Sequence, residues 1–205
     1  APKASDVMSN TRQRLIDTAF ELFGRNGFHA IGMDAILNEV GCSKQTFYNH
    51  FESKDDLVLA VLKHRHEVEG KNWERLFTEI AGPDPRDRLY ALFDVLETWF
   101  NQPEWRGCIF ITAAAEFPLR HEPAHIAAAE HFESFREWIH QMAIFAGAEN
   151  PKLLADQLIL LVEGAVSVQH LTRDTACVEI ARAMAIELLD RHLGASAQLV
   201  ETARA

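Results

Sequence analysis

The residues best suited to chemistry lie in the short segment 44–51, where polar side chains alternate with two aromatic ones. If this segment is projected as a helix at about 100° per residue, Phe47 and Phe51 fall within about 40° of each other and must face a core. Gln45, Thr46 and Asn49 lie almost opposite. Amide and hydroxyl groups of this size form hydrogen bonds with the edges of bases in the major groove of DNA. The pattern therefore predicts a helix with one buried face and one face that contacts bases.

Side chains that suit phosphate contacts flank this face. Tyr48 and His50 stand beside it, while Lys44 and Lys54 lie at the starts of consecutive helices, where the helix dipole and the ammonium group both attract an anion. The competing interpretation is an ordinary pair of helices with a hydrated polar face. The sequence fits it less well, because such a face normally carries charged side chains and this one offers amides, hydroxyls, Tyr and His.

Two helices and a tight turn are needed to hold these side chains. The sequence predicts a helix over 33–40, a turn over 41–43, and a second helix over 44–50 that Ser43 caps. This is the helix-turn-helix arrangement. Helical periodicity continues along the chain, and Gly, Pro and cap residues separate its segments. Further helices are predicted at 10–26, 53–80, 85–100, 105–117, 123–145, 151–171 and 175–193, which gives an all-α fold of about nine helices and no strand.

Residues 11–62 resemble the DNA-binding domain of the tetracycline-repressor (TetR) family of bacterial regulators. The most specific part of the resemblance is Gly41-x-Ser43 followed by Phe47-Tyr48-x-His50-Phe51-x-x-Lys54. Earlier positions agree as well, namely Ala19, Leu22-Phe23, Gly27-Phe28 and Ile36. The resemblance implies a helix-turn-helix at about 32–51 whose second helix enters the major groove.

The resemblance also implies roles for individual positions. Residues 44–46 match base-facing positions of the family, and Tyr48, His50 and Lys54 match positions that contact the DNA backbone. In two places the sequence departs from the family pattern. Gly32 stands where relatives carry a capping Ser or Thr that touches a phosphate, and Gln45 replaces a common Gly. The predicted DNA contacts are Arg12, Gly32, Ser43, Lys44, Gln45, Thr46, Tyr48, Asn49, His50 and Lys54.

Charge is distributed unevenly along the chain. Residues 1–66 hold eight Lys and Arg against eight Asp and Glu, whereas the whole chain has a formal net charge of −10. The acidic remainder repels DNA, so we expect modest non-specific affinity that falls steeply with salt. No apolar run approaches the roughly 20 residues that span a bilayer, and no signal segment is visible. Together with only three cysteines, this predicts a cytoplasmic protein without a membrane partner.

Beyond residue 62 the resemblance is to the architecture of the family and not to a motif. It implies a flexible arm at 1–10, the DNA-binding domain at 11–62, an effector-binding and dimerisation domain at 63–195, and a loose tail at 196–205. Helix 151–171 contains LILLVEGAVSV, which is apolar on nearly every side and needs cover on two sides. We expect helices 151–171 and 175–192 of two subunits to form a homodimer that reads a palindromic operator in double-stranded DNA. A single buried helix in a monomer is the alternative.

The domain after residue 62 is rich in aromatic side chains with polar residues among them. Such a set is more often packed core than a ligand site, but a mostly apolar cavity with a few polar groups is typical of small-molecule sites. The resemblance implies a small-molecule effector that shifts the dimer away from its DNA-binding form, and the composition favours a largely apolar effector. The predicted ligand contacts are Phe93, Phe110, Thr112, Glu116, Phe117, Trp138, Glu163 and His170.

Other kinds of site find little support in the sequence. His121 and His125 have the spacing of a helical metal pair, but Pro123 between them starts a helix and separates their faces. No CxxC or HExxH motif is present, so we expect no metal and no cofactor. No nucleophile, phosphate-loop or paired-carboxylate motif points to catalysis. The sequence thus predicts a repressor. The alternatives are a helical small-molecule-binding protein, an enzyme, or an interaction module without specific DNA binding.

Overall fold

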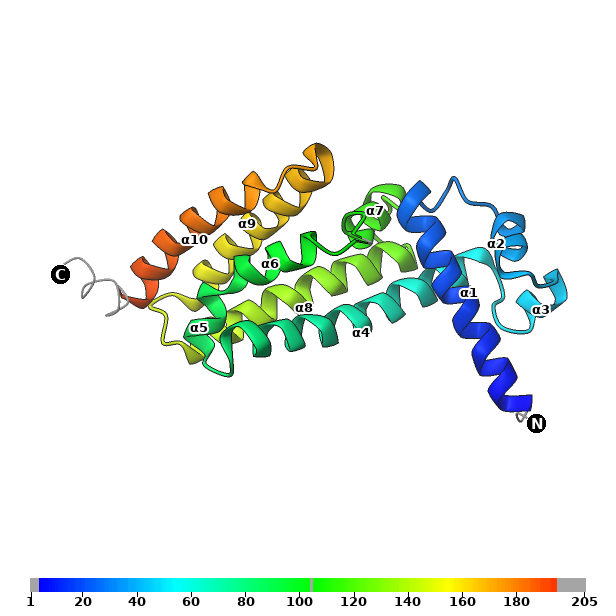
Figure 1. Cartoon of the computed structure of the whole chain (residues 1–205), viewed down its shortest axis with the longest axis horizontal. Helices are drawn as coiled ribbons and strands as arrows, with labels where there is room; N and C mark the ends of the chain where they lie inside the picture. The colour runs from blue at the N-terminus through cyan, green and yellow to red at the C-terminus, as the bar shows by residue number, and fades with distance from the viewer. Residues whose placement is uncertain (1–3, 104, 195–205) are drawn as a thin grey trace. The chain divides into compact units, whose positions relative to one another are not determined.

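The computed structural model describes residues 4–103 and 105–194, with side chains from residue 10 onward. Within these ranges the chain forms ten α-helices and no strand, which confirms the all-α prediction (Figure 1). The helices are α1 (Ala4–Asn26), α2 (Met33–Val40), α3 (Lys44–Tyr48), α4 (Lys54–Ala81), α5 (Pro85–Tyr90), α6 (Leu92–Phe100), α7 (Ile109–Glu116), α8 (Pro123–Phe145), α9 (Pro151–Thr172) and α10 (Ala176–Leu193).

Most of these helices begin and end at the residues that the sequence marks. Gly41 adopts a left-handed conformation with φ of 72° and ends α2, and Asn150 caps α9 by accepting a hydrogen bond from the Leu153 amide. Asp84 caps α5 in the same way, with Pro85 at the first helical position. The Gly, Pro and cap residues of the sequence therefore determine where these helices begin and end.

Besides the end of α3, described below, three helix boundaries differ from the prediction. The segment 85–100 is interrupted at Ala91, whose ψ of −1° ends α5 and starts α6, so ten helices are found and not nine. The helix expected from 105 begins at Ile109, because Gly107 has a φ of 103° that a helix does not allow. Helix α1 begins at Ala4 and takes in most of the segment 1–10 expected to be a loose arm, since no Gly or Pro stops it there.

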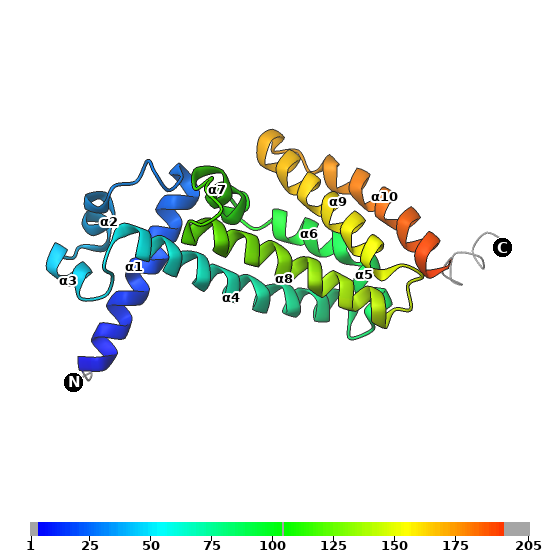
Figure 2. The ribbon, with the colours of Figure 1, turned by 180° about the vertical axis from the view of Figure 1, so that it is seen from behind.

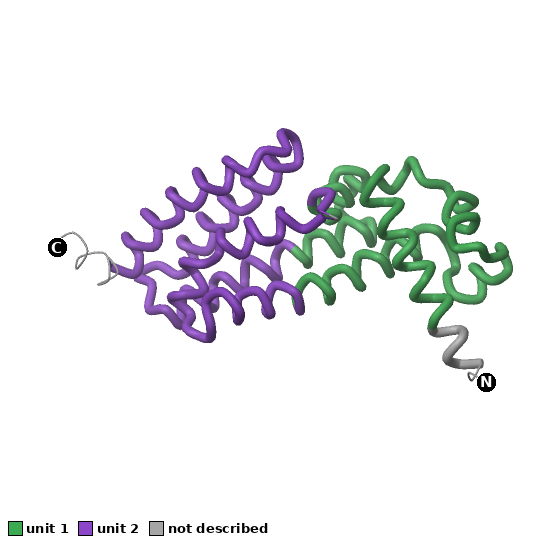
Figure 3. The backbone as a smooth tube through the Cα atoms, in the orientation of Figure 1, with its two compact units in different colours: residues 1–70, 108–131 green, residues 71–107, 132–205 purple. Residues whose placement is uncertain are grey.

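The chain divides into two compact units, shown in two colours in Figure 3. The head unit comprises residues 1–70 and 108–131, and the body unit comprises residues 71–107 and 132–205. These boundaries differ from the expected division at 62/63, because α7 and the first part of α8 belong to the head unit. The predicted tail at 196–205 and the first three residues of the predicted arm lie outside the described residues.

The core of the head unit explains this division. Side chains of α1 to α4, among them Leu15, Phe23, Phe47 and Leu57, are fully buried in one apolar cluster. Five residues from α7 and α8 complete the cluster: Ile109, Phe110, Ala113, Ala124 and Ala128. Burial of this apolar surface holds the helix-turn-helix on its support.

In the body unit, α9 and α10 run side by side, as both views of the ribbon show (Figures 1 and 2). Small buried residues of α10, Ala181 and Ala185, permit this close approach. Arg182 of α10 binds the carboxylates of Glu97 and Asp94 on α6, which ties the pair of helices to the rest of the unit.

Candidate nucleic-acid interface

The helix-turn-helix is built as the sequence predicts over 32–51. The turn after Gly41 leads to Ser43, whose backbone is extended and whose hydroxyl accepts a hydrogen bond of 3.1 Å from the Thr46 amide. This cap starts α3. The helix ends at Tyr48, two residues earlier than expected, and the amides of His50 and Phe51 then bond to the carbonyl of Phe47.

Helix α3 has one buried face and one open face. Phe47 and Phe51 are fully buried, and their ring centroids lie 5.6 Å apart in the core of the head unit. Lys44, Gln45, Tyr48 and Asn49 are exposed, with Tyr48 at 53%. The two aromatic anchors thus fix the rotation of the helix and turn its polar residues outward, as the projection predicts.

The outward polar groups bond to one another. The amide nitrogen of Gln45 donates to Asn49 Oδ1 at 3.2 Å, and the hydroxyls of Ser43 and Thr46 lie 2.9 Å apart. These exposed contacts cost little to break, because water or a base edge replaces them. The side chains are held close to their helix and ready to exchange partners.

Lys44 is held by an acid of the preceding helix. Its ammonium lies 2.9 Å from Asp34 Oδ1, with both side chains well exposed. The hydrogen bond and the charge of Asp34 raise the pKa of Lys44. Lys44 is therefore charged, but the nearby carboxylate offsets the field that a phosphate would meet.

The flanking residues have less uniform surroundings. The guanidinium of Arg12 is exposed and lies 5.0 Å from the ring centroid of Phe51, and His50 is half-buried. Lys54 instead turns inward, donating to the carbonyl of Phe28 at 2.6 Å. Gly32 caps α2 with an extended backbone and no side-chain hydrogen bond. Of the predicted phosphate contacts, Lys54 and Lys44 are thus both bound within the head unit, Lys54 to a carbonyl and Lys44 to a carboxylate.

Two residues outside the predicted set also position the interface. Arg14 of α1 donates to the carbonyl of Val40 at 2.7 Å and so satisfies an end of α2 that has no helical partner. Glu116 accepts hydrogen bonds from the amides of Phe28 and His29 at 2.9 and 2.7 Å. No local sequence pattern marks either contact, because the partners are 26 or more residues away.

Glu116 was predicted to contact a ligand, and the structure places its carboxylate in the head unit instead. Partial burial by itself would raise the pKa of Glu116, but the bonds from His29 and Phe28 outweigh it, and the pKa is lowered. Phe117 packs beside it, 5.6 Å from Phe28 between ring centroids. Both side chains brace the loop between α1 and α2.

The other predicted ligand contacts are divided between the two units. In the head unit, the ring of Phe110 is buried against His131, and Thr112 donates to the carbonyl of Cys108. In the body unit, Phe93 is buried, and Trp138 packs 4.4 Å from Phe77 between ring centroids.

Glu163 and His170 belong to α9 in the same body unit. Glu163 is half-buried, and burial raises its pKa. His170 is exposed and contacts the edge of Trp105.

The described residues hold neither a metal-ligand cluster nor a membrane-spanning helix. No three His, Cys, Asp or Glu side chains of this part of the chain converge to hold a metal ion. None of its helices is long and apolar enough to cross a bilayer.

Comparison with known proteins identifies the family from both halves of the chain. Residues 15–61 match the model of bacterial regulatory proteins of the tetR family, and residues 85–185 match the tetracyclin repressor-like C-terminal domain. The first match contains α2, α3 and the start of α4, and the second contains α5 to α9 and part of α10. The similarity therefore reaches well beyond the helix-turn-helix.

Solved structures agree with this over nearly the whole chain. The TetR-family regulator SCO4454 from Streptomyces coelicolor is 27% identical with a TM-score of 0.81, covering 90% of this chain and 97% of that one. A TetR-type regulator, sav143, from Streptomyces avermitilis is 30% identical with a TM-score of 0.74, covering 89% and 97%.

The first matches to curated relatives are shorter. The transcriptional activator FasR of Mycolicibacterium smegmatis is 49% identical over 55 residues, which are 27% of this chain and 25% of FasR. The first curated relatives are matched over about a quarter of their own length. The family models, the solved structures and the geometry of α2 and α3 lead to one conclusion: the chain belongs to the TetR family of DNA-binding transcriptional regulators.

Proposed function

We propose that this protein works as a homodimer that binds a palindromic operator through α3 and that a small, largely apolar effector releases it. The observation that carries the proposal is the construction of α3. Two fully buried rings, Phe47 and Phe51, hold it, and its opposite face offers amides and hydroxyls to a partner. This face suits base edges, since each hydrogen bond that it makes to itself is exposed and readily exchanged.

In the proposed complex, Gln45, Thr46 and Asn49 contact bases. Asn and Gln side chains bind adenine through two hydrogen bonds, so the exchange of the Gln45–Asn49 contact for a base pair gives sequence preference. Tyr48, His50, Lys44 and Arg12 contact phosphates and set the position of α3. Lys54 acts mainly through the loop that it holds at Phe28.

An exposed apolar surface on α9 and α10 supports the homodimer. Leu160 and Leu171 of α9 are 71% and 81% exposed, and Ile180 of α10 is 64% exposed. Side chains of this size in contact with water mark a surface that a partner covers. The surface consists of Leu153, Leu160, Val168, Leu171, Ile180 and Met184. A second copy of the same two helices would bury it in a symmetric interface.

The effector and the direction of regulation follow from the family and not from a contact. Release by an effector requires that it bind one form of the dimer better than the other. We propose repression, although the relative FasR is named an activator. A regulator of this kind needs no catalytic group, and since bacterial DNA lies in the cytoplasm, we propose that the protein acts there.

Selection of bound sequences from a random duplex pool tests the proposal. We expect the protein to enrich a palindrome whose half-sites lie on one side of the duplex, roughly 34–36 Å apart. The double variant Gln45→Ala/Tyr48→Ala should enrich nothing, whereas Glu149→Gln, an exposed change in the loop between α8 and α9, should enrich the same palindrome. Absence of enrichment by a folded dimer would contradict the DNA-binding function.

A further inference from the structure

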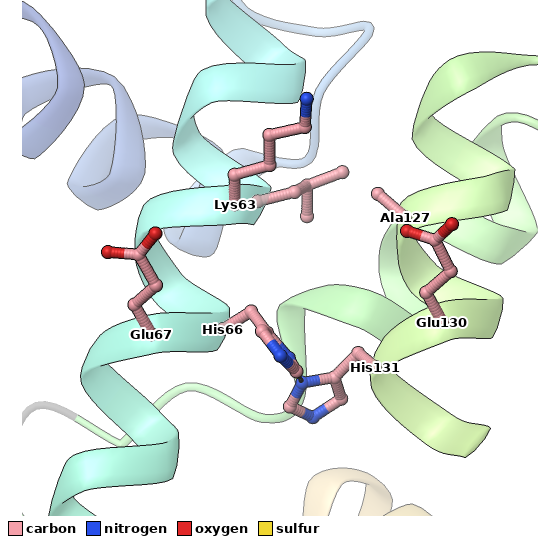
Figure 4. Close-up of a pocket in the computed structure, with 7 residues that line it drawn as sticks. Lys63, His66, Glu67, Ala127, Glu130 and His131 are labelled. Atoms are coloured by element: carbon pink, nitrogen blue, oxygen red, sulfur yellow. Dashed lines mark hydrogen bonds between the residues drawn. The ribbon is translucent and has the colours of Figure 1, made fainter. Parts of the chain in front are cut away.

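A cleft between α4 and α8 is not used by the DNA-binding function. It lies wholly in the head unit and has a volume of about 160 Å³. Its apolar floor consists of Leu62 and Ala127, and its other lining residues are ionisable: Lys63, His66, Glu67, Glu130 and His131. Figure 4 shows the two imidazoles meeting at one end of the cleft, with Lys63 at the other. A cleft of this size suits a small metabolite and is too small for a drug-sized molecule.

Opposite charges face this cleft without being paired. Lys63 comes from α4 and Glu130 from α8, and neither forms a hydrogen bond or an ion pair with any residue that the structure describes. Arg65 and Glu69, which lie nearby and are at least partly buried, pair with each other. In Figure 4, Glu130 lies on the α8 side of the cleft, whereas Glu67 turns its carboxylate to the outer side of α4. The lining therefore holds one cationic group, Lys63, and two carboxylates, of which Glu130 comes from α8.

The two imidazoles are ordered by a network behind them. His66 Nδ1 and His131 Nδ1 are 3.0 Å apart, and His131 Nε2 lies 3.7 Å from Glu69 Oε2. Burial, together with the charges of His66 and Arg65, lowers the pKa of His131 to about 4, so its ring is neutral at physiological pH. Glu69 is in turn held by Arg65.

The contact between the two imidazoles leaves one ring nitrogen of His66 unused. The Nδ1 atoms of His66 and His131 meet each other, and the Nε2 atom of His66 takes no part in that contact. His66 is exposed, so this nitrogen is open to a ligand. An imidazole nitrogen and the Glu130 carboxylate together suit a group with several N–H donors, which is what an ammonium ion supplies.

We propose that the cleft binds a small zwitterion with an ammonium group and a carboxylate, such as a neutral amino acid. The ammonium would donate to Glu130 and His66, the carboxylate would accept from Lys63, and a short apolar side chain would rest on Leu62 and Ala127. A ligand with only a carboxylate would leave Glu130 without a positively charged partner, and a ligand with only an ammonium group would leave Lys63 without a negatively charged one. A metal ion fits less well, because no three ligand side chains converge among the described residues.

The cleft is also backed by the core that supports the helix-turn-helix. Leu62 belongs to the apolar cluster of the head unit, and Ala127 packs against it. A ligand in the cleft would thus stabilise the unit that carries α3. Binding itself needs no DNA, so the proposal stands or fails separately from the operator.

Calorimetric titration of the full-length protein with glycine, L-alanine and L-leucine tests the proposal. Two analogues of leucine, 3-methylbutylamine and 4-methylpentanoate, each lack one charge. At least one amino acid should bind about tenfold more tightly than either analogue, since a hydrogen bond to a charged group is lost in each case. Glu130→Gln should weaken the amino acid and the amine alike, whereas Lys63→Met should weaken the amino acid and leave the amine unaffected.

Matched controls are Glu149→Gln and Lys71→Met, exposed residues whose side chains bond to no residue that the structure describes and do not line the cleft. They should bind as the parent protein does. No binding of any amino acid, or equal loss in the control variants, would overturn the proposal. Zn²⁺ is titrated in parallel, and binding of Zn²⁺ alone that is lost in His66→Ala would replace the zwitterion with a metal.

Discussion

At the scale of single residues, Glu116 connects the end of α7 to the loop before α2. It accepts three hydrogen bonds, from the Phe28 and His29 amides and from the His29 ring. Its pKa is lowered in the folded protein. Its contribution to stability is therefore fully present above the unfolded pKa of about 4.5 and is lost as the pH falls through the lower folded pKa.

We predict that Glu116→Gln lowers the free energy of unfolding by about 1–2 kcal/mol at neutral pH, since one of the amides loses its acceptor. The variant should also lose part of the dependence on pH below 4.5. Urea unfolding at pH 7 and at successively lower pH measures both effects. Equal slopes in the acid range for the two proteins would show that Glu116 carries no charge-dependent contact.

Glu116 stabilises the head unit, whereas Asp34 should weaken DNA binding, because its carboxylate competes with a phosphate for Lys44. We predict that Asp34→Asn strengthens binding to DNA of any sequence by several-fold and makes it more sensitive to salt, since the variant removes an acid and frees the lysine. Fluorescence anisotropy at two salt concentrations measures this. Glu149→Gln removes the same charge in the loop between α8 and α9 and is the control. If both variants gain affinity equally, net charge and not Lys44 is the cause.

At the scale of helices, the sequence predicts most elements because their ends carry local signals. Ser43, Asp84 and Asn150 all cap helices as their positions suggest. The break at Ala91 could not be predicted, because no Gly or Pro marks it. The start at Ile109 depends on Gly107, where a Cβ would collide with the ring of His170, and only the folded structure shows that contact.

The residues of the candidate sites also differ in whether a local sequence pattern reveals them. The open face of α3 follows from helical periodicity, so the positions of Gln45 and Asn49 were predictable. The pair of His66 and His131 joins residues 65 positions apart, and the pattern around either residue gives no sign of the other. Glu116 is predicted to contact a ligand because its surroundings in sequence are apolar, whereas the two amides that bind it lie 87 and 88 positions away.

A single substitution at the start of helix α2 should increase both the stability of the protein and its affinity for the operator. Gly32 has an extended backbone with φ of −79°, and a Cβ there would meet no atom within 4 Å. We predict that Gly32→Ser raises the free energy of unfolding by about 0.5 kcal/mol, through a cap and a less flexible unfolded chain. Thermal unfolding measures the gain, and operator affinity should rise because the hydroxyl can reach a phosphate. Gly32→Ala keeps the backbone effect alone, and equal affinity of Ala and Ser variants would exclude the phosphate contact.

At the scale of the whole molecule, a protein that binds DNA through a helix as short as α3 gains affinity when it forms a dimer. Five residues of α3 offer few contacts in one groove, and two linked heads bind more tightly by an effective-concentration effect. The apolar surface of α9 and α10 must then form the dimer interface. Its exposed side chains come from the two helices that pack against each other, so a charge on each helix should open the interface.

We predict that Leu160→Glu/Ile180→Glu is a folded monomer, because two carboxylates on this surface cannot be buried unpaired against a second copy. Light scattering after size exclusion gives the mass. Affinity for the palindromic operator should fall on the order of 100-fold, while affinity for a single half-site stays unchanged. Leu119→Glu, on a side chain that is 55% exposed in the head unit, should remain a dimer. A double variant that stays dimeric would move the interface away from α9 and α10, and a monomer with full operator affinity would show that the two heads bind independently.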